Sequence, residues 1–279
     1  MTTLLTPSAA REILERHGLA TRKRAGQHLL VDPNTVRRIV GAARLDADDV
    51  VLEVGPGIGS LTLGLVGAVR RIVAVEIDAG FVTALADVLA PIDGVEVVHA
   101  DALAVDLGAL VDGGPARLVA NLPYNVATPI VVDALASGAF TELFVMVQRE
   151  VGERWAARPG DTGYSGVSAK LGVLADVSVE LHIPRGVFLP VPNVDSVMVR
   201  LTRRPDAPDT AGFAAIARVI DAAFAQRRKT LRNTLRALGS AEEVAAAAGA
   251  AGVDLGARPE ELAPSTLVRL AEAFTRPHP

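Results

Sequence analysis

The chain has 279 residues, of which 50% are hydrophobic and 22% charged, a composition that excludes a disordered or fibrous protein. This length is sufficient for one large α/β domain with a small appendage. The sequence has no cysteine, which excludes disulfides, thiolate metal sites and a cysteine nucleophile, and its net charge of −4 does not by itself indicate a nucleic-acid partner.

The first 45 residues predict two helices separated by a loop. Residues 6–18 have apolar side chains at helical spacing and end at a glycine. Asp32 and Pro33 are the residue types typical of an N-cap and a first helical position, and a helical pattern follows them. The loop between the two helices carries the basic residues 22–24 and the segment Gly26-Gln27-His28-Leu29-Leu30.

From residue 50 onward, short β-branched runs alternate with helical patterns. The predicted parallel strands are Val50–Val54, Arg71–Val75, Val95–His99, Arg117–Ala120 and Leu143–Gln148. Strands joined by helices form βαβ units with right-handed crossovers, so we expect a mostly parallel sheet. Two further strands, at 177–183 and 196–202, would complete seven strands with an antiparallel end. The sequence therefore predicts a Rossmann-like α/β fold.

Residues 203–208 have the composition of a linker, and beyond them the strand patterns cease. We therefore divide the chain into a domain at 1–204, with a helical extension at 1–45, and a small all-helical subdomain at 205–279. Within that subdomain Phe224 and either Leu231 or Leu235 lie at helical spacing and are expected to face the core.

The charge is unevenly distributed along the chain. Residues 46–112 contain 12 acidic and two basic side chains, a net −10, so the rest of the chain carries +6. Its basic residues gather in three clusters, at 22–24, at 200–204 and at 227–236. Any one cluster is commonly a solvated face, but three together predict a surface that binds a polyanion.

We expect a cytoplasmic protein without a membrane partner. The N-terminus lacks the basic region, apolar core and cleavage site of a signal peptide. The longest uncharged run in the first half, residues 54–69, falls short of the ~20 apolar residues that span a bilayer, and it carries five glycines.

A glycine-rich turn follows the first predicted strand of the sheet. It reads Glu53-Val-Gly55-Pro-Gly57-Ile-Gly59, between a strand and a helix. Glycines there let the backbone turn tightly and approach a ligand closely, although a generic strand-to-helix turn explains a lone triplet equally well. A dinucleotide-binding fingerprint has its third glycine where this chain has Ser60.

Two acids follow the next two strands. Glu76 ends the second strand and Asp101 follows the third, both at the edge of the sheet that carries the glycine turn. Each alone is commonly a solvated strand-end residue. Together they predict acceptors for two ribose hydroxyls and for an adenine amino group, without a phosphate cradle. This pattern favours S-adenosylmethionine over NAD as the cofactor.

The fourth strand ends in Asn121-Leu122-Pro123-Tyr124. The exocyclic amine of adenine is a poor nucleophile, because its lone pair is delocalised into the ring. The amide oxygen of Asn121 and the backbone carbonyl of Leu122 can each accept an N6–H bond and aim the lone pair at a methyl carbon. Tyr124 offers a ring on which an extruded base can stack. An ordinary turn is the alternative reading of this segment.

In order, these motifs resemble one family. They are Gly26-Gln-His-Leu-Leu30, the glycine turn, Glu76, Asp101, Asn121-Leu-Pro-Tyr124, Phe188-x-Pro-x-Pro-Asn-Val-Asp-Ser196 and Phe224-Ala-Gln-Arg-Arg-Lys-Thr-Leu-Arg-Asn233. From about residue 20 to 275 the chain resembles the small-subunit ribosomal RNA adenine N6,N6-dimethyltransferases. This resemblance implies a class I methyltransferase that dimethylates two adjacent adenines in the 3′-terminal hairpin loop of 16S ribosomal RNA. It also implies a small-subunit precursor as partner, and we expect a monomer.

The resemblance implies a role for individual residues. The cofactor contacts carried over, together with a second glycine of the turn, are His28, Leu30, Gly55, Gly57, Glu76, Asp101 and Asn121. Asn121 and Leu122 would act on the amine, and Tyr124 and Phe188 would sandwich the target base. The residues expected to bind RNA are Arg227, Arg228, Lys229 and Arg232. The family usually has Asn-Phe-Leu where this chain has His28-Leu29-Leu30. The histidines show no ligand spacing, so no metal is expected.

Two alternatives remain open from the sequence. A 23S ribosomal RNA adenine methyltransferase of the antibiotic-resistance type shares the core motifs, but the motifs that begin at Phe188 and Phe224 favour the small-subunit enzyme. A non-catalytic ribosome assembly or RNA-binding factor on the same scaffold is disfavoured by the intact pair of Asn121 and Tyr124.

Overall fold

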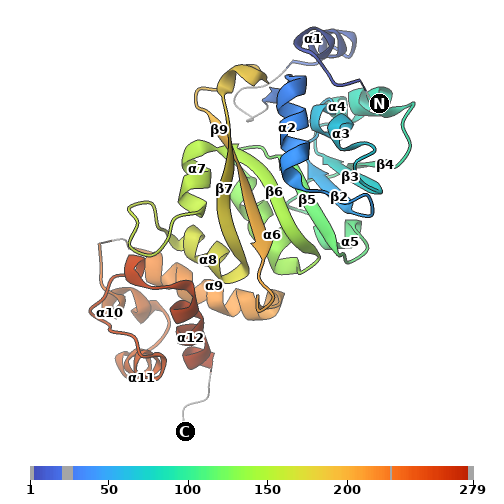
Figure 1. Ribbon diagram of the computed structural model, residues 1–279. Helices are drawn as coiled ribbons and strands as arrows, with labels where there is room; N and C mark the ends of the chain where they lie inside the picture. The colour runs from blue at the N-terminus through green and yellow to red at the C-terminus, as the bar shows by residue number, and fades with distance from the viewer. Residues whose placement is uncertain (1–2, 21–27, 227, 276–279) are drawn as a thin grey trace. The chain divides into compact units, whose positions relative to one another are not determined.

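The computed structural model of the chain describes residues 3–20, 28–226 and 228–275 (Figure 1). Its main feature is a seven-stranded sheet in the order β4-β3-β2-β5-β6-β9-β7. The strands are β2 (Val50–Val54), β3 (Arg71–Glu76), β4 (Val95–His99), β5 (Ala116–Asn121), β6 (Phe140–Gln148), β7 (Ala175–Ile183) and β9 (Ser196–Arg203). Strands β4, β3, β2, β5 and β6 run parallel, and β9 is antiparallel to β6. The predicted fold is confirmed.

Helices alternate with the strands up to β6, as the sequence pattern predicts, and further helices follow β9. They are α1 (Pro7–Arg16), α2 (Pro33–Ala43), α3 (Ser60–Leu65), α4 (Ala79–Leu89), α5 (Leu107–Leu110), α6 (Ala127–Ser137), α7 (Arg149–Trp155), α8 (Gly166–Leu174), α9 (Thr210–Phe224), α10 (Leu231–Thr234), α11 (Ala241–Ala251) and α12 (Pro264–Thr275). Short 3₁₀ turns lie at Arg185–Val187, Leu235–Ala237 and Pro259–Glu261. Asp32 caps α2 by accepting a 2.8 Å hydrogen bond from the backbone N–H of Thr35, so the predicted N-cap is confirmed. None of the described helices is long and apolar enough to cross a membrane.

Helices α2 and α3 pack on the sheet through a buried apolar cluster. Val36 and Ile39 of α2 belong to the same buried cluster as Leu61 and Leu65 of α3 and residues of six strands of the seven-stranded sheet. Strand β2 is buried along its whole length, as expected for a central parallel strand with both faces covered. The helices α2 and α3 and the strands of the sheet therefore share one apolar core.

A second, two-stranded sheet was not predicted. Leu29–Leu30 (β1) pairs antiparallel with Phe188–Leu189 (β8), with Leu30 opposite Phe188. Two-residue strands are too short to show a periodic pattern, and their partners are about 160 residues apart, so sequence patterns could only indicate a loop. This pairing fixes the segment that precedes α2 against the segment that precedes β9.

The chain divides into two compact units. One comprises residues 1–152 and 178–202, and the other comprises 153–177 and 203–279. The predicted division at residue 204 therefore differs from the structure, because residues 153–177 belong to the second unit. The reason is that α8 contacts α9 and α12, and the hydroxyl of Tyr164 donates a 3.0 Å hydrogen bond to the carbonyl of Leu262.

In the second unit, the basic run does not lie on one helix. Helix α9 ends at Phe224 and α10 begins at Leu231, so Arg228 and Lys229 lie in the turn between them. Leu231 and Leu235 are both buried, where the spacing predicted one of them, whereas Phe224 is only half-buried and contacts the ring of Tyr164 edge-on. The helical spacing between Phe224 and Leu231 therefore does not reflect one continuous helix.

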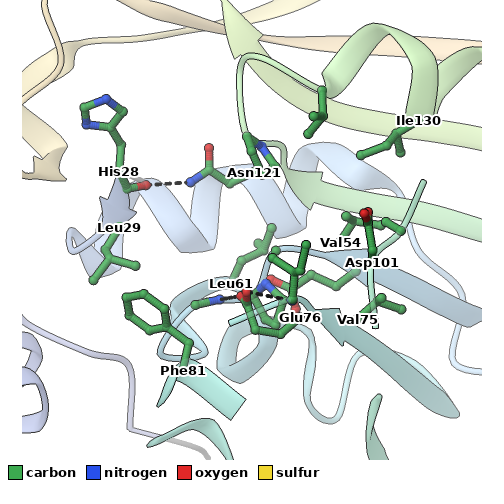
Figure 2. A pocket seen from close by; sticks show the side chains of 18 of the residues that line it. His28, Leu29, Val54, Leu61, Val75, Glu76, Phe81, Asp101, Asn121 and Ile130 are labelled. Carbon is green, nitrogen blue, oxygen red and sulfur yellow. Dashed lines mark hydrogen bonds between the residues drawn. The ribbon is translucent and has the colours of Figure 1, made fainter. Parts of the chain in front are cut away.

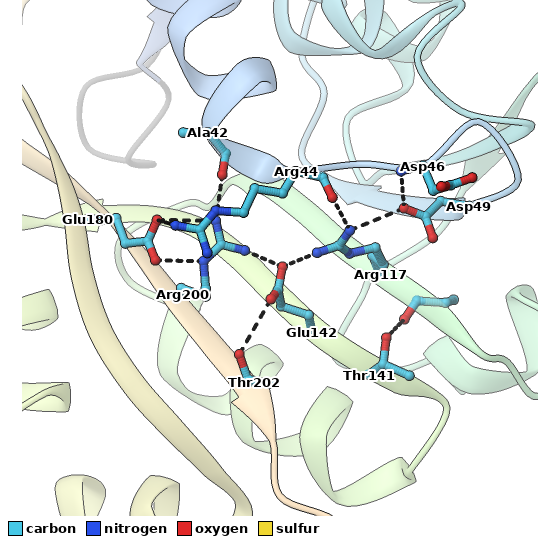
Figure 3. Close-up of polar contacts among 11 residues, drawn as sticks. Ala42, Arg44, Asp46, Asp49, Arg117, Thr141, Glu142, Glu180, Arg200 and Thr202 are labelled. Carbon is cyan, nitrogen blue, oxygen red and sulfur yellow. Dashed lines mark hydrogen bonds and ion pairs between the residues drawn. The ribbon is translucent and has the colours of Figure 1, made fainter.

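A buried ion-pair network joins the sheet to the end of α2 (Figure 3). Glu142 on β6 accepts hydrogen bonds from Arg117 on β5 and from Arg200 on β9. Arg200 also pairs with Glu180 on β7 at 2.7 Å, and its guanidinium lies 4.7 Å from the ring centre of Phe144. Arg200 also donates to the carbonyl of Ala42, in the last turn of α2, and Arg117 donates to the carbonyl of Arg44, the C-cap residue of α2. Such donors satisfy carbonyls that a helix end leaves unpaired.

This network corrects the expectation for the basic cluster at 200–204. Arg200 is only 6% exposed and is neutralised by two carboxylates, and Arg204 pairs with Asp176 and Asp206. The cluster therefore supports the sheet rather than a polyanion-binding surface. The basic cluster at 22–24 lies outside the described residues.

Candidate active site

A cavity of about 260 Å³ opens at the carboxyl edge of the parallel strands (Figure 2). The strands β2, β3, β4 and β5 run parallel, so the residues that follow them meet at this edge. Every residue that the sequence assigned to cofactor binding lines the cavity: His28, Leu30, Gly55, Gly57, Glu76, Asp101 and Asn121. The structure therefore brings together residues spread over almost a hundred positions of sequence.

The glycine turn forms one wall of the cavity. Gly57 has a φ of +58°, and a Cβ atom there would lie 2.6 Å from the side chain of Leu29. Gly55 has a φ of +70° and donates its N–H to the carbonyl of Val75. Both positions favour glycine because the left-handed conformation disfavours a side chain, and at Gly57 the side chain of Leu29 would also have to shift.

Glu76 is the buried acid of the cavity. It is 6% exposed, and its carboxylate accepts hydrogen bonds from the backbone N–H groups of Gly57, Ile77 and Asp78 at 3.1, 2.9 and 3.0 Å. Burial raises the pKa of Glu76, and the three backbone donors oppose that rise. The hydrogen bond from Gly57 connects Glu76 to the glycine turn, so the position of the carboxylate relative to the turn is fixed.

Asp101 lies at the open side of the cavity. Its side chain is exposed, and one carboxylate oxygen accepts a 2.9 Å hydrogen bond from the backbone N–H of Leu103. This bond orients the carboxylate without exhausting its acceptors. Ile77 and Leu103 are large exposed apolar residues that also line the cavity. A carboxylate beside two apolar side chains suits a ligand that has an apolar ring with polar groups at its edge.

The orientation of Asn121 is fixed by one hydrogen bond. Its side-chain Nδ2 donates to the backbone carbonyl of His28 at 2.9 Å (Figure 2). A carbonyl oxygen only accepts, so the amide nitrogen must face His28, and Oδ1 must point the other way. Asn121 therefore presents Oδ1, which accepts from no donor among the described residues, from the end of β5 at the cavity.

The side chain of His28 does not point towards Glu76 (Figure 2). Its ring stacks on the ring of Tyr124, with 5.6 Å between the ring centres and 28° between the planes. The ring nitrogen Nδ1 lies 2.8 Å from the carbonyl oxygen of Pro190. His28 thus lines the cavity, but its backbone holds Asn121 while its side chain contacts two other active-site segments.

The remaining residues assigned to the reaction lie around the cavity rather than along its wall. The hydroxyl of Tyr124 is hydrogen-bonded to Ser196 at 2.8 Å, and burial raises the pKa of Tyr124. Leu122 is 1% exposed, and its N–H donates to the carbonyl of Met146. Phe188 is 2% exposed in the apolar cluster beneath the sheet edge.

Three polar residues that flank the glycine turn were not assigned a role from the sequence: Glu53, Ser60 and Thr62. Thr62 donates a 2.6 Å hydrogen bond to Glu53, which is 1% exposed. Among the buried side-chain nitrogen and oxygen atoms of the described residues, only Oγ of Ser60 lacks a hydrogen-bond partner. Glu53 and Ser60 both line the cavity. The sequence did contain a signal for two of them, because Glu53 is a polar residue in an otherwise apolar strand and Ser60 is a polar residue at the first position of a helix.

Glu53 makes the stability of the protein depend on pH. Burial raises its pKa from 4.5 to about 8, the bond from Thr62 opposes the rise, and the charge of Glu76 adds to it. The folded state binds this proton more tightly, so its contribution to stability is complete below pH 4.5 and is lost as pH rises to 8. The loss is at most about 1.4 kcal/mol per pH unit.

We therefore expect Glu53→Gln to flatten the pH dependence of stability. Urea unfolding of the wild type and the variant between pH 5 and 8.5 measures the difference. The free energy of unfolding of the wild type should fall relative to that of the variant as pH rises, because glutamine cannot ionise. Two parallel curves over this range would contradict the assignment of a protonated Glu53.

The basic run of the second unit is exposed where it is described. Four side chains are exposed and make no ion pair with another described residue: Arg228, Lys229, Arg232 and Arg236. Arg227 lies outside the described residues. The described residues also contain no group of three or more histidine, aspartate or glutamate side chains placed to hold a metal ion.

Comparison with known proteins identifies close relatives. The model of the family "Ribosomal RNA adenine dimethylase" matches residues 18–276. The "Ribosomal RNA small subunit methyltransferase A" of Thermobifida fusca is 49% identical over 276 residues, covering 96% of each chain. The protein of the same name from Streptomyces coelicolor is 46% identical over 277 residues, again covering 96% of each chain.

Solved structures share the fold. The 23S rRNA methyltransferase ErmE aligns with a TM-score of 0.66 and 29% identity, covering 89% of this chain and all of that one. A dimethyladenosine transferase from Plasmodium falciparum aligns with a TM-score of 0.71 and 23% identity, covering 87% of this chain and 96% of that one. The latter likeness supports the fold alone.

Proposed function

Because this chain belongs to the ribosomal RNA adenine dimethylase family, we propose that it dimethylates N6 of two adjacent adenines in the 3′-terminal hairpin loop of 16S ribosomal RNA. The methyl donor would be S-adenosylmethionine, and the substrate a precursor of the small ribosomal subunit. The observation that carries the proposal is Asn121, whose amide is locked by the carbonyl of His28 so that Oδ1 is left to accept at the cavity. We also propose that the chain acts as a monomer and in the cytoplasm.

Four features of the cavity fit the proposed cofactor. Glu76 is buried and retains acceptor capacity for ribose hydroxyls, and Asp101 offers a carboxylate at the outer edge for an adenine amino group. The hydroxyl of Ser60 is buried and has no hydrogen-bond partner among the residues that the structure describes, and a buried polar group in that state is stabilised by a polar ligand. Apolar contacts from Ile77 and Leu103 suit the faces of a purine. When bound, the cofactor supplies an activated methyl group on a positively charged sulfur.

The residues at the end of β5 would activate the adenine amine. Oδ1 of Asn121 and the carbonyl oxygen of Leu122 each accept one N6–H bond, which weakens conjugation of the nitrogen lone pair with the ring. With the cofactor bound, these two acceptors would hold the amine so that its lone pair faces the methyl group that the cofactor supplies. The nitrogen afterwards releases its proton to solvent. Catalysis of this kind depends mainly on positioning, and neither residue needs to change its own protonation state.

One assay tests the reaction and its alternatives. Purified protein, methyl-labelled S-adenosylmethionine, and 30S or 50S particles are combined, and label in each RNA is counted. We expect label in N6,N6-dimethyladenine of 16S RNA from undermethylated 30S particles. Label in 23S RNA alone would support the antibiotic-resistance type of enzyme, and no label in either would support a non-catalytic factor. The relatives at 46–49% identity are named for the small subunit, which supports the first outcome.

We further propose that the basic run in the second unit binds RNA phosphates. Its side chains are exposed and without carboxylate partners in the described chain, in contrast to Arg200. The double variant Arg228→Ala/Arg232→Ala should weaken binding to 30S particles by about 1–3 kcal/mol. Because phosphate contacts release counterions, the variant should also show a smaller salt dependence. Filter binding across a salt series measures both quantities, and Arg227 is a third candidate in this run.

A matched control removes the same charge elsewhere in the second unit. Arg218→Ala/Arg269→Ala replaces two exposed arginines of α9 and α12 and should leave the affinity and salt slope nearly unchanged. Equal losses in both double variants would mean that net charge governs binding. If the Arg228/Arg232 variant keeps the affinity and slope of the wild type, this run does not hold RNA.

A further inference from the structure

We propose that Glu53 is a specificity-determining residue that distinguishes the positively charged cofactor from the product left after methyl transfer. Its carboxyl group carries a proton in the free protein and releases that proton to water when the cationic cofactor binds. The product has one positive charge fewer, so its binding releases less of this proton. This inference deepens the proposed function and rests on S-adenosylmethionine being the methyl donor.

The order of the strands places Glu53 where the methyl group must be transferred. Neighbouring strands run in the order β4-β3-β2-β5. Asp101 follows β4 and is proposed to accept from adenine, and Glu76 ends β3 and is proposed to accept from ribose. Asn121 ends β5, where the target amine is proposed to bind (Figure 2). Strand β2, which carries Glu53, lies between the ribose and the amine, and the sulfur that bears the methyl group has to lie there too.

The carboxyl group of Glu53 is enclosed by protein and faces the cavity. Glu53 is 1% exposed and lines the cavity, and its Oε2 accepts a 2.6 Å hydrogen bond from the hydroxyl of Thr62. Glu76 of the neighbouring strand is the charged group that acts on it, and it repels an ionised Glu53. The hydrogen bond from Thr62 is therefore the one interaction among these that favours the ionised form.

No lysine or arginine lines the cavity among the residues that the structure describes. The titratable residues there are His28, Glu53, Glu76 and Asp101. The ring of His28 lies against Tyr124 and the carbonyl of Pro190. An ionised Glu53 thus has no cationic side chain to neutralise it in the described part of the cavity. A cationic ligand supplies the missing charge.

The surroundings of Glu53 link cofactor binding to loss of a proton. Burial raises its pKa to about 8, so the carboxyl of the free protein is mostly protonated at neutral pH. A positive charge beside the carboxyl favours the ionised form and lowers this pKa. Binding of a cation and release of the proton therefore favour each other. The sign follows: affinity for the cation rises as pH rises towards 8.

The charge at sulfur distinguishes cofactor from product. S-adenosylmethionine carries a sulfonium and an ammonium group, whereas S-adenosylhomocysteine keeps the ammonium and has a neutral thioether. Methyl transfer leaves the bonding electron pair on sulfur and so removes one positive charge. The carboxylate of Glu53 then takes up one proton from water. The attraction between opposite charges is lost in the product complex, which favours exchange of product for cofactor.

Calorimetric titration of the wild type and of Glu53→Gln with S-adenosylmethionine tests the linkage. Glutamine has the same shape, can accept from Thr62, and cannot ionise. The affinity of the wild type relative to the variant should be about equal at pH 6 and about tenfold higher at pH 8, because the ionised fraction of Glu53 rises at most tenfold per pH unit. The amine of the ligand titrates against both proteins, so the ratio isolates Glu53.

Proton release is the second measurement. Titrations at pH 7 in two buffers of different ionisation enthalpy give the number of protons released per bound ligand. With S-adenosylmethionine, the wild type should release about half a proton or more in excess of Glu53→Gln. With S-adenosylhomocysteine, that excess should be less than half as large. Difference infrared spectra of the wild type should also show loss of a protonated carboxyl band when S-adenosylmethionine binds.

Two further variants serve as controls. Glu96→Gln removes an exposed carboxylate of β4 that pairs with Arg71, and it should keep the pH dependence and proton release of the wild type. Thr62→Val removes the hydrogen bond that favours ionised Glu53, so the rise in affinity should move to higher pH. Thr62→Val retains the carboxyl group, so it tests the linkage even if Glu53→Gln does not fold.

The outcomes that contradict the proposal are distinct. An affinity ratio that does not change with pH, or equal proton release by the wild type and Glu53→Gln, would overturn the linkage. Equal excess release with the two ligands would overturn the distinction by charge at sulfur. Absence of S-adenosylmethionine binding by the wild type would instead refute the cofactor of the proposed function.

Discussion

Replacement of Asn121 by alanine should reduce methyl transfer to 30S particles by about 100-fold or more at saturating cofactor, a loss typical of removing one group that stabilises a transition state. The variant loses the oxygen that accepts from the adenine amine. That bond strengthens as the nitrogen lone pair leaves conjugation, so it contributes more in the transition state than in the bound state. Single-turnover transfer of labelled methyl groups measures the effect.

Binding measurements distinguish this role from a general loss of the site. RNA affinity of Asn121→Ala should stay within threefold of the wild type, because Asn121 is one of many contacts. Some loss of cofactor affinity is also expected, since Asn121 lines the cavity. Turnover within threefold of the wild type would remove Asn121 from the chemistry. Thermal melting controls for the lost hydrogen bond to the carbonyl of His28.

Replacement of Glu76 by alanine should lower the affinity for S-adenosylmethionine at least tenfold. The carboxylate is buried and is proposed to accept bonds from two ribose hydroxyls, each worth roughly 1.5–3 kcal/mol when charge-assisted. A tenfold change corresponds to about 1.4 kcal/mol, so the loss of either bond is sufficient. Isothermal titration calorimetry with purified protein measures the affinity directly.

A matched variant shows whether charge alone accounts for the change. Glu96→Ala removes a carboxylate of β4 that is exposed and pairs with Arg71, and it should leave cofactor affinity within twofold of the wild type. Glu76 also accepts a hydrogen bond from the N–H of Gly57, so circular dichroism is needed to show that the Glu76→Ala variant remains folded. Unchanged affinity in folded Glu76→Ala would exclude this acid from the cofactor site.

The sequence by itself determined the sheet and the residues that surround the cavity. Strand β2 is a run of buried residues, and the glycine turn, Glu76 and Asn121 each stand at or just after the end of a parallel strand. Such residues meet at one edge because the strands are parallel, whatever the details of packing. Alternation of strands and helices is a local pattern, and the chain's own spacing is sufficient to predict it.

Only the tertiary structure decided how the reaction residues face one another. The contact between His28 and Tyr124 depends on the pairing of Leu29–Leu30 with Phe188–Leu189, and that pairing joins segments about 160 residues apart. The same pairing buries Phe188, which its motif placed against the base. Arg200 belonged to a basic cluster in the sequence, yet β9 brings it beside Glu142 and Glu180 in the folded sheet. Residues that are distant in sequence determine whether a side chain is buried and whether its charge is neutralised. No pattern within a few neighbouring residues identifies those partners.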